Sequence, residues 1–119
     1  MITSLNHDEF FVFGSNLAGR HGAGAALQAR DHFGAQYGIG EGITGRSYAF
    51  PSLDEHLRQR TRRKLEASRD RLYKACAEYA SYRFLLTKVG CGLGGYEENY
   101  MRSLFTDAPN NLILPEDWR

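Results

Sequence analysis

The chain has 119 residues, enough for one domain whose core needs no disulfide or metal to stabilise it. A hydrophobic content of 42% excludes a disordered protein, and a net charge of +1 gives no general attraction to nucleic acid or membranes. Two cysteines cannot form a disulfide framework, and no apolar run nears the roughly 18 residues of a membrane-spanning helix. We therefore expect one cytoplasmic domain over residues 1–119.

The first part of the chain predicts a strand, a loop and a helix. Residues 10–13 form a continuous apolar run, Phe-Phe-Val-Phe, which is typical of a strand buried on both faces. A loop over 14–22 leads into a helix over 23–33, whose small residues allow close approach to a sheet. Gly34 suits the end of that helix, where the backbone often adopts a positive φ.

The remaining elements alternate between strands and helices. They are expected at 36–45 (loop), 47–50 (strand ended by Pro51), 55–79 (long helix), 83–89 (buried strand), 90–95 (loop), 97–105 (helix) and 111–114 (strand). This alternation predicts an α/β domain with a mainly parallel sheet and helices on its faces. Ligands of such sheets bind beyond the carboxyl ends of the strands, where two of these loops lie.

Glycines mark those two loops. All thirteen fall in two segments, nine between Gly14 and Gly45 and four between Gly90 and Gly95. Each cluster follows an apolar run, and a strand, a glycine-rich turn and a helix together aim backbone N–H groups at an anion. The second loop lacks the Gly-Lys-Ser/Thr ending of a nucleotide-hydrolysing P-loop and is not the dinucleotide fingerprint. The pattern therefore predicts two loops that close on a phosphorylated ligand.

The candidate ligand-binding residues come from both loops. They are Ser15, Asn16, Arg20, His21, Gly22, Ala23 and Gly24 in the first, and Gly90, Cys91, Gly92, Leu93, Gly94, Gly95 and Tyr96 in the second. Asn16 could hold sugar hydroxyls through its amide, or it could satisfy the backbone of a turn. Gly22 to Gly24 could present N–H groups to phosphate at the start of the helix.

Three residues are candidates for catalysis. Asn16 could orient water, His21 has a suitable reference pKa for a general acid, and Glu41 could activate water. The alternatives are an exposed loop histidine for His21 and a solvated loop acid for Glu41. No histidine or cysteine has a partner at metal-ligand spacing, so we predict neither a metal nor a cofactor.

The chain also carries a basic stretch. Residues 58–71 hold seven lysines and arginines against two acids, while the tail from Tyr96 onward is acidic. Residues 58–64 could contact phosphates of a nucleic acid, and the alternative is a solvated helix face.

The two loops together resemble the macrodomains, a family that binds ADP-ribose and related metabolites on a three-layer α/β/α sandwich. Asn16 followed by residues 21–28, His-Gly-Ala-Gly-Ala-Ala-Leu-Gln, is similar to the family's asparagine and helix opening over the distal ribose. Residues 89–96, Val-Gly-Cys-Gly-Leu-Gly-Gly-Tyr, resemble its diphosphate loop, and residues 40–51 its middle segment. Residues 50–58 and the basic stretch resemble the subgroup of terminal ADP-ribose glycohydrolases and antitoxins that reverse DNA ADP-ribosylation.

The chain departs from the family in ways that bear on function. Macrodomains start with two further strands and an acid that contacts adenine, so this chain resembles an N-terminally shortened version. The subgroup's lysine nucleophile aligns with Arg30, which stays protonated and cannot form that adduct. The family's catalytic aspartates align with Gly94 and Gly24. The resemblance thus implies a retained binding scaffold without the familiar catalytic side chains.

Three functions follow as expectations. The first is a module that binds ADP-ribose or a related phosphorylated nucleotide, free or attached to protein or nucleic acid. The second is a hydrolase of ADP-ribosyl linkages or of ADP-ribose 1″-phosphate, and the third is a nucleic-acid-associated protein that uses residues 58–64. A shortened sheet would also leave an edge open, which favours a homodimer.

Overall fold

A five-stranded sheet forms the centre of the molecule, and the computed structural model describes residues 2–119. Its strands lie in the order β2–β3–β1–β4–β5. Their bounds are Glu9–Asn16 (β1), Gly42–Thr44 (β2), Ser47–Leu53 (β3), Arg83–Leu86 (β4) and Leu112–Ile113 (β5). β1 pairs in parallel with β3 and β4, β4 pairs in parallel with β5, and β2 runs antiparallel to β3. The prediction of an α/β domain with a mainly parallel sheet is therefore confirmed.

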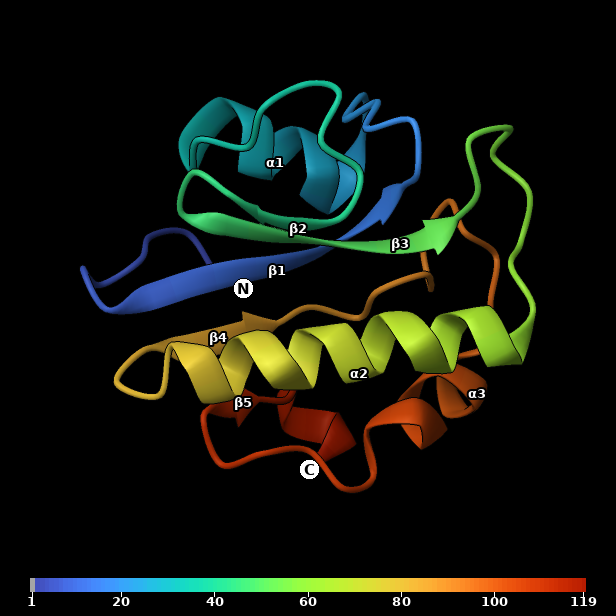
Figure 1. The fold of residues 1–119 in the computed structure, drawn as a ribbon. Coiled ribbons are helices and arrows are strands. Elements are labelled where there is room, and N and C mark those ends of the chain that lie inside the picture. The colour runs from blue at the N-terminus through green and yellow to red at the C-terminus, as the bar shows by residue number, and fades with distance from the viewer. Residues whose placement is uncertain (1) are drawn as a thin grey trace.

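Helices cover both faces of this sheet (Figure 1). They are α1 (Gly24–His32), α2 (Arg62–Glu78) and α3 (Glu98–Arg102), with 3₁₀ turns at Ser103–Phe105 and Glu116–Trp118. Side chains alternate along β1, so Phe11 and Phe13 pack with α1, whereas Phe10 and Val12 pack into the larger core beneath α2. The continuous apolar run at 10–13 is thus buried on both faces, as predicted.

The long helix starts later than predicted. Helical spacing indicated a start at residue 55, but α2 begins at Arg62. The Asp54 carboxylate accepts hydrogen bonds from the backbone N–H groups of His56 (2.8 Å) and Arg58 (2.9 Å), which folds residues 54–58 into a turn. Thr61 then caps the helix by accepting a bond from the N–H of Lys64 at 3.3 Å.

Two strand predictions also need correction. β3 was expected to end at Phe50 but continues through Pro51 to Leu53. Because β2 pairs with β3 only as far as Ala49, the missing N–H of Pro51 removes no ladder bond on that side. The strand β2 itself lies inside the predicted loop over 36–45. The glycines of residues 36–45 indicated a loop, because a three-residue strand depends on its pairing with β3 and not on local sequence.

The other predicted elements are present with shifted ends. β4 stops at Leu86 rather than residue 89, and the helix predicted over 97–105 divides into α3 and a 3₁₀ turn. Residues 2–8 form no helix or strand before β1. The sheet edges are therefore β2 and β5. Dimerisation across one of them stays a prediction.

Candidate functional site

A cavity of about 640 Å³ lies where the carboxyl ends of β1, β3 and β4 meet. The loops that follow these strands leave the sheet at the same end, as Figure 1 shows. The cavity is lined by residues 14–16, 20, 22–26, 52–53, 57, 87–90 and 92–94. Both glycine-rich loops and the start of α1 therefore meet at one site. This is the position at which parallel α/β sheets bind ligands.

The first loop is held in shape by Asn16. The Asn16 Oδ1 accepts a hydrogen bond from the Arg20 N–H at 3.1 Å, and the Asn16 Nδ2 donates to the Arg20 carbonyl at 3.0 Å. Asn16 is buried and lines the cavity. Its amide thus makes the turn contacts that formed one of the two alternatives for this residue, and these two bonds leave one N–H and one oxygen lone pair of the amide unused.

The start of α1 supplies unpaired backbone donors. Its N-cap is Ala23, which has no side chain that could cap the helix, and the first helical bond runs from the Leu27 N–H to the Ala23 carbonyl at 3.2 Å. Among residues 2–119, nothing accepts a hydrogen bond from the N–H groups of Gly24, Ala25 and Ala26, and all three residues line the cavity. An uncapped helix start on a cavity is suited to an anion because the helix dipole adds partial positive charge.

The second loop supplies a similar set of donors. Inside it, the N–H groups of Cys91, Gly95 and Tyr96 bond to backbone carbonyls at 3.0 to 3.2 Å. The three consecutive N–H groups of residues 92–94 have no acceptor within the described part of the chain, and these residues line the cavity. Successive free N–H groups in a tight loop form a concave site for an anion.

Two of the cavity glycines have no steric reason to be glycine. A Cβ on Gly94 would lie 2.6 Å from the Gly90 carbonyl oxygen, so the loop itself requires that glycine. A Cβ on Gly22 or Gly92 would meet no atom within 4 Å, and neither residue has a positive φ. Both nevertheless line the cavity. A glycine that the fold does not need is explained by a ligand that approaches the backbone closely.

The charged side chains of the cavity are both cations. Lys88 is paired with Glu98 at 2.8 Å and with Asp117 at 2.7 Å, and hydrogen bonds to these two acids raise the pKa of the lysine. Arg20 is exposed and forms no ion pair with any residue in the 2–119 range. No aspartate, glutamate or histidine is among the lining residues that the structure describes. The cavity therefore favours an anion and lacks a side chain for acid–base chemistry.

His21 does not reach the cavity. It lies between two lining residues, but its own ring is fully buried beneath the first loop. The ring Nε2 lies 3.1 Å from the Gln36 carbonyl oxygen, and the ring packs edge-on against Phe13 at a centroid distance of 5.1 Å. Burial lowers the pKa of His21. Neither the predicted general acid nor the exposed loop histidine describes this position.

Glu41 also lies outside the cavity. Its carboxylate forms a two-pronged ion pair with Arg71 of α2, with distances of 2.9 Å to the arginine Nε and 3.2 Å to a terminal nitrogen. This pair lies on the α2 side of the sheet, whereas the cavity opens at the strand ends. The structure therefore does not place Glu41 where it could activate water on a bound ligand.

Three residues of the second loop that were predicted to bind the ligand lie next to the cavity without lining it. Cys91, Gly95 and Tyr96 are not lining residues. Burial raises the pKa of the Cys91 thiol, so it is no activated nucleophile. The Tyr96 hydroxyl donates to the Ser52 carbonyl at 2.7 Å and accepts from the Arg60 N–H at 2.7 Å. Tyr96 thus ties the second loop to the end of β3. Apart from these three residues and His21, the other ten ligand-binding candidates line the cavity.

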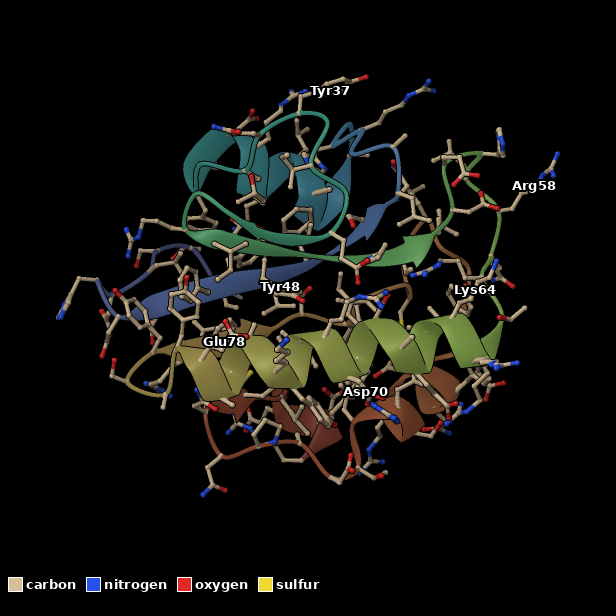
Figure 2. All side chains as sticks on the ribbon, viewed as in Figure 1. Tyr37, Tyr48, Arg58, Lys64, Asp70 and Glu78 are labelled. Carbon is tan, nitrogen blue, oxygen red and sulfur yellow. The ribbon has the colours of Figure 1, made fainter. Side chains whose placement is uncertain are left out.

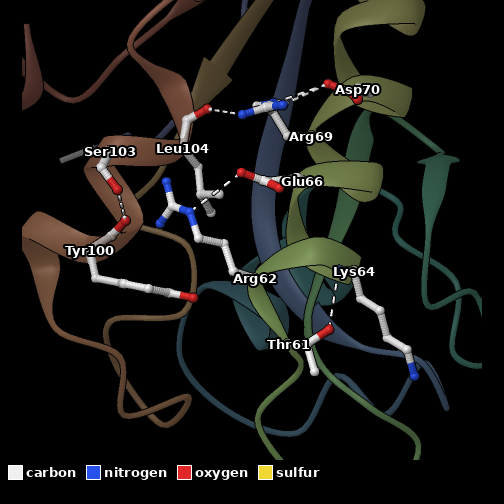
Figure 3. Close-up of polar contacts among 9 residues, drawn as sticks. All are labelled: Thr61, Arg62, Lys64, Glu66, Arg69, Asp70, Tyr100, Ser103 and Leu104. Carbon is white, nitrogen blue, oxygen red and sulfur yellow. Dashed lines mark hydrogen bonds and ion pairs between the residues drawn. The ribbon is translucent and has the colours of Figure 1, made fainter.

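Three of the seven cations in the basic stretch, Arg62, Arg69 and Arg71, are paired with acids within the protein. Arg62 pairs with Glu66 at 3.4 Å and lies over the Tyr100 ring, and Arg69 pairs with Asp70 at 3.0 Å and donates to the Leu104 carbonyl (Figure 3). Arg60 donates to the Pro51 carbonyl and the Ser68 hydroxyl. Figure 2 shows Arg58 projecting away from the body of the molecule. Arg58, Arg63 and Lys64 form no ion pair among residues 2–119, so the nucleic-acid contact and the solvated helix face both stay open as alternatives.

The sequence did not point to the third wall of the cavity. This wall consists of Ser52 and Leu53 at the end of β3 and of Leu57 in the turn after it. Leu57 is 54% exposed and has a φ of 62°, the one positive φ of a non-glycine residue among those described. A leucine in the sequence does not predict a left-handed backbone. The turn at Asp54 imposes this conformation on Leu57.

We expect Leu57→Asn to stabilise the protein. A left-handed backbone costs a leucine roughly 1–2 kcal/mol, whereas asparagine adopts this conformation readily. Leu57 is half exposed, so the substitution removes little packing. Urea denaturation should show an unfolding free energy that is higher by about 0.5–1 kcal/mol.

Leu93→Asn is the matched control for this substitution. Leu93 is an 84% exposed leucine on the same cavity but has an ordinary φ. The Leu93→Asn substitution should therefore leave the unfolding free energy unchanged. An equal gain in both variants would show that removal of an exposed leucine, not relief of strain, is responsible.

Two general findings complete the description of the site. Between residues 2 and 119, no three His, Cys, Asp or Glu side chains gather in a way that could hold a metal ion. In the same range, no helix has the length and apolar character needed to cross a membrane.

Comparison with known proteins gave no relative. No family model, no curated protein and no solved structure matches this chain. The function has to be argued from the geometry of the cavity.

Proposed function

We propose that this protein is a macrodomain-like module that binds ADP-ribose or a related phosphorylated nucleotide. The observation that carries the proposal is the convergence of two sets of free backbone N–H groups, residues 24–26 and 92–94, on one cavity. One phosphate at each set would accept several hydrogen bonds without any side chain. A ligand with two linked phosphates fits two adjacent donor sets better than a ligand with one.

The size of the cavity supports a nucleotide-sized ligand. Its volume of about 640 Å³ lies inside the range of roughly 300–1,000 Å³ that is usual for small-molecule sites. Charge-assisted hydrogen bonds contribute roughly 1.5–3 kcal/mol each, so two or three of them at each phosphate would give substantial affinity. Arg20 adds a cation that is not already paired.

The geometry favours binding over hydrolysis. His21 and Glu41, the two predicted acid–base groups, lie outside the cavity, and its lining side chains include no other group that could transfer a proton near neutral pH. Asn16, the third predicted catalytic residue, does line the cavity and could orient water, but no general acid or base accompanies it there. The nucleic-acid alternative keeps the cations Arg58, Arg63 and Lys64, but it has no counterpart to the two sets of backbone donors at the cavity.

Titration calorimetry tests the proposal. Purified protein is titrated with ADP-ribose, and separately with ADP-ribose 1″-phosphate and inorganic pyrophosphate. We expect saturable binding of both nucleotides and weaker binding of pyrophosphate. No heat of binding with either nucleotide at millimolar concentration would refute the proposal.

A further inference from the structure

His21 is a buried titratable group that the proposed function does not use. Its side chain is fully buried, and it lies in the first loop between Arg20 and Gly22, both of which line the cavity. The two neighbours of His21 thus face the ligand site, whereas the His21 side chain points into the protein.

The contacts of the ring define its charge state. A carbonyl oxygen only accepts, so the Nε2 that lies 3.1 Å from the Gln36 carbonyl must carry the proton. The Nδ1 of the same ring is buried and has no hydrogen-bond partner within residues 2–119. The neutral tautomer with hydrogen on Nε2 is therefore the form that this pocket accepts. Protonation would put a charge on a buried ring and a second proton on Nδ1, which has no hydrogen-bond partner among residues 2–119.

The surroundings of the ring come from three elements. β1 contributes the Phe13 ring, and the segment after α1 contributes the carbonyls of Gln36 and Ile39, which favour the protonated form. The positive charge of Arg30 on α1 disfavours the protonated form, and the sequence neighbour Arg20 is exposed to solvent. Burial outweighs the carbonyls, so the pKa of His21 is below its ordinary value.

The other anchors of the first loop lie nearer to β1, where the Leu17 N–H donates to the Leu53 carbonyl at 3.1 Å and the Gly19 N–H to the Asn16 carbonyl at 2.9 Å. Asn16 holds the Arg20 backbone, the Gly38 N–H donates to the Gly19 carbonyl at 2.8 Å, and His21 joins the loop to residue 36. Beyond His21, residues 22 and 23 are exposed and lead directly to the free N–H groups of α1. His21 is thus the last side-chain anchor before the donors that face the cavity.

We propose that His21 is the positioning residue of the anion site, and that only its neutral form holds the first loop against the ligand. The inference rests on the proposed function for its ligand, but its effect on the loop can be measured without one. At acidic pH the imidazole gains a proton more easily when it leaves its pocket, so protonation favours a released loop. With a reference pKa of about 6.5 for the released histidine, protonation shifts the equilibrium between anchored and released loop by at most about 30-fold near pH 5.

The ligand test compares affinity for ADP-ribose at about pH 7.5 and about pH 5. ADP-ribose suits this test because its two phosphates stay fully ionised between these values. We expect affinity to fall several-fold in the wild type and to change by less than twofold in His21→Gln, whose amide can still donate to the Gln36 carbonyl. His56→Gln is the matched control, because His56 is 66% exposed and should leave the pH response as in the wild type. An equal pH response in His21→Gln and wild type would overturn the proposal.

A second measurement needs no ligand and keeps the test valid if His21→Gln does not fold. Amide hydrogen exchange of residues 17–24 in the wild type, corrected for the intrinsic rate at each pH, should lose protection at the acidic pH while the β1 amides stay protected. Unchanged protection of the loop would overturn the proposal. If the loop responds as expected but ADP-ribose does not bind at either pH, the proposed ligand is wrong and the role of His21 stands.

Discussion

Replacing Gly92 by glutamate is expected to lower the affinity for ADP-ribose by at least about 100-fold, or about 2.7 kcal/mol, without unfolding the protein. A Cβ at this position meets no atom within 4 Å, so the fold tolerates a side chain. The same side chain would stand beside the free N–H groups of the second loop and bring a carboxylate to the anion site. Calorimetry measures the affinity, and the melting temperature should stay within about 2 °C of the wild type.

Two controls separate a local effect at the anion site from the effects of added negative charge and of a disrupted loop. Ala67→Glu adds the same charge on an exposed position of α2, away from the cavity, and should leave the affinity unchanged. Gly94→Ala addresses the same loop but places a Cβ 2.6 Å from the Gly90 carbonyl oxygen, so it should lower the melting temperature. Wild-type affinity in a folded Gly92→Glu variant would show that the second loop does not hold the ligand.

The second large effect is expected at Arg20. Arg20→Ala should weaken ADP-ribose binding by about 10–100-fold, the equivalent of roughly 1.5–3 kcal/mol for hydrogen bonds to a charged group. Arg20 is an exposed cation on the cavity and makes no ion pair among residues 2–119, so a bound phosphate gains its full interaction. The loss should shrink as salt is raised, because the site is open to solvent.

Lys88→Ala is the informative comparison for Arg20. Lys88 lines the same cavity but is already paired with Glu98 and Asp117, so a phosphate would have to compete with two carboxylates. Its removal should change the affinity by less than about threefold, within the range typical of exposed ion pairs. Equal losses in both variants would show that the ion pairs of Lys88 open when the ligand binds.

The sequence predicted the parts of this fold that depend on local pattern. The apolar run at 10–13 led directly to a strand buried on both faces, and the alternation of strands and helices led to a mainly parallel sheet. It did not predict β2 or the start of α2. β2 depends on its pairing with β3, and the helix start depends on the Asp54 turn, which competes with a helical pattern that continues upstream.

The candidate site could be predicted only at the level of loops. Glycine content located both loops, but it could not separate Gly94, which the backbone requires, from Gly92, which it does not. Sequence also could not show that His21 points inward while both its neighbours face the cavity, because loops have no fixed side-chain period. Glu41 was misplaced for the same reason, since its partner Arg71 is thirty positions away in the chain.

An amide chemical-shift titration tests most directly whether the two loops form one anion site. Uniformly ¹⁵N-labelled protein is titrated with ADP-ribose while the backbone N–H signals are followed. The proposed site predicts saturable shifts with one dissociation constant at residues 24–26 and 92–94, the donors that lack partners. Absence of shifts at millimolar ligand, or shifts confined to α2 and its basic residues, would contradict it.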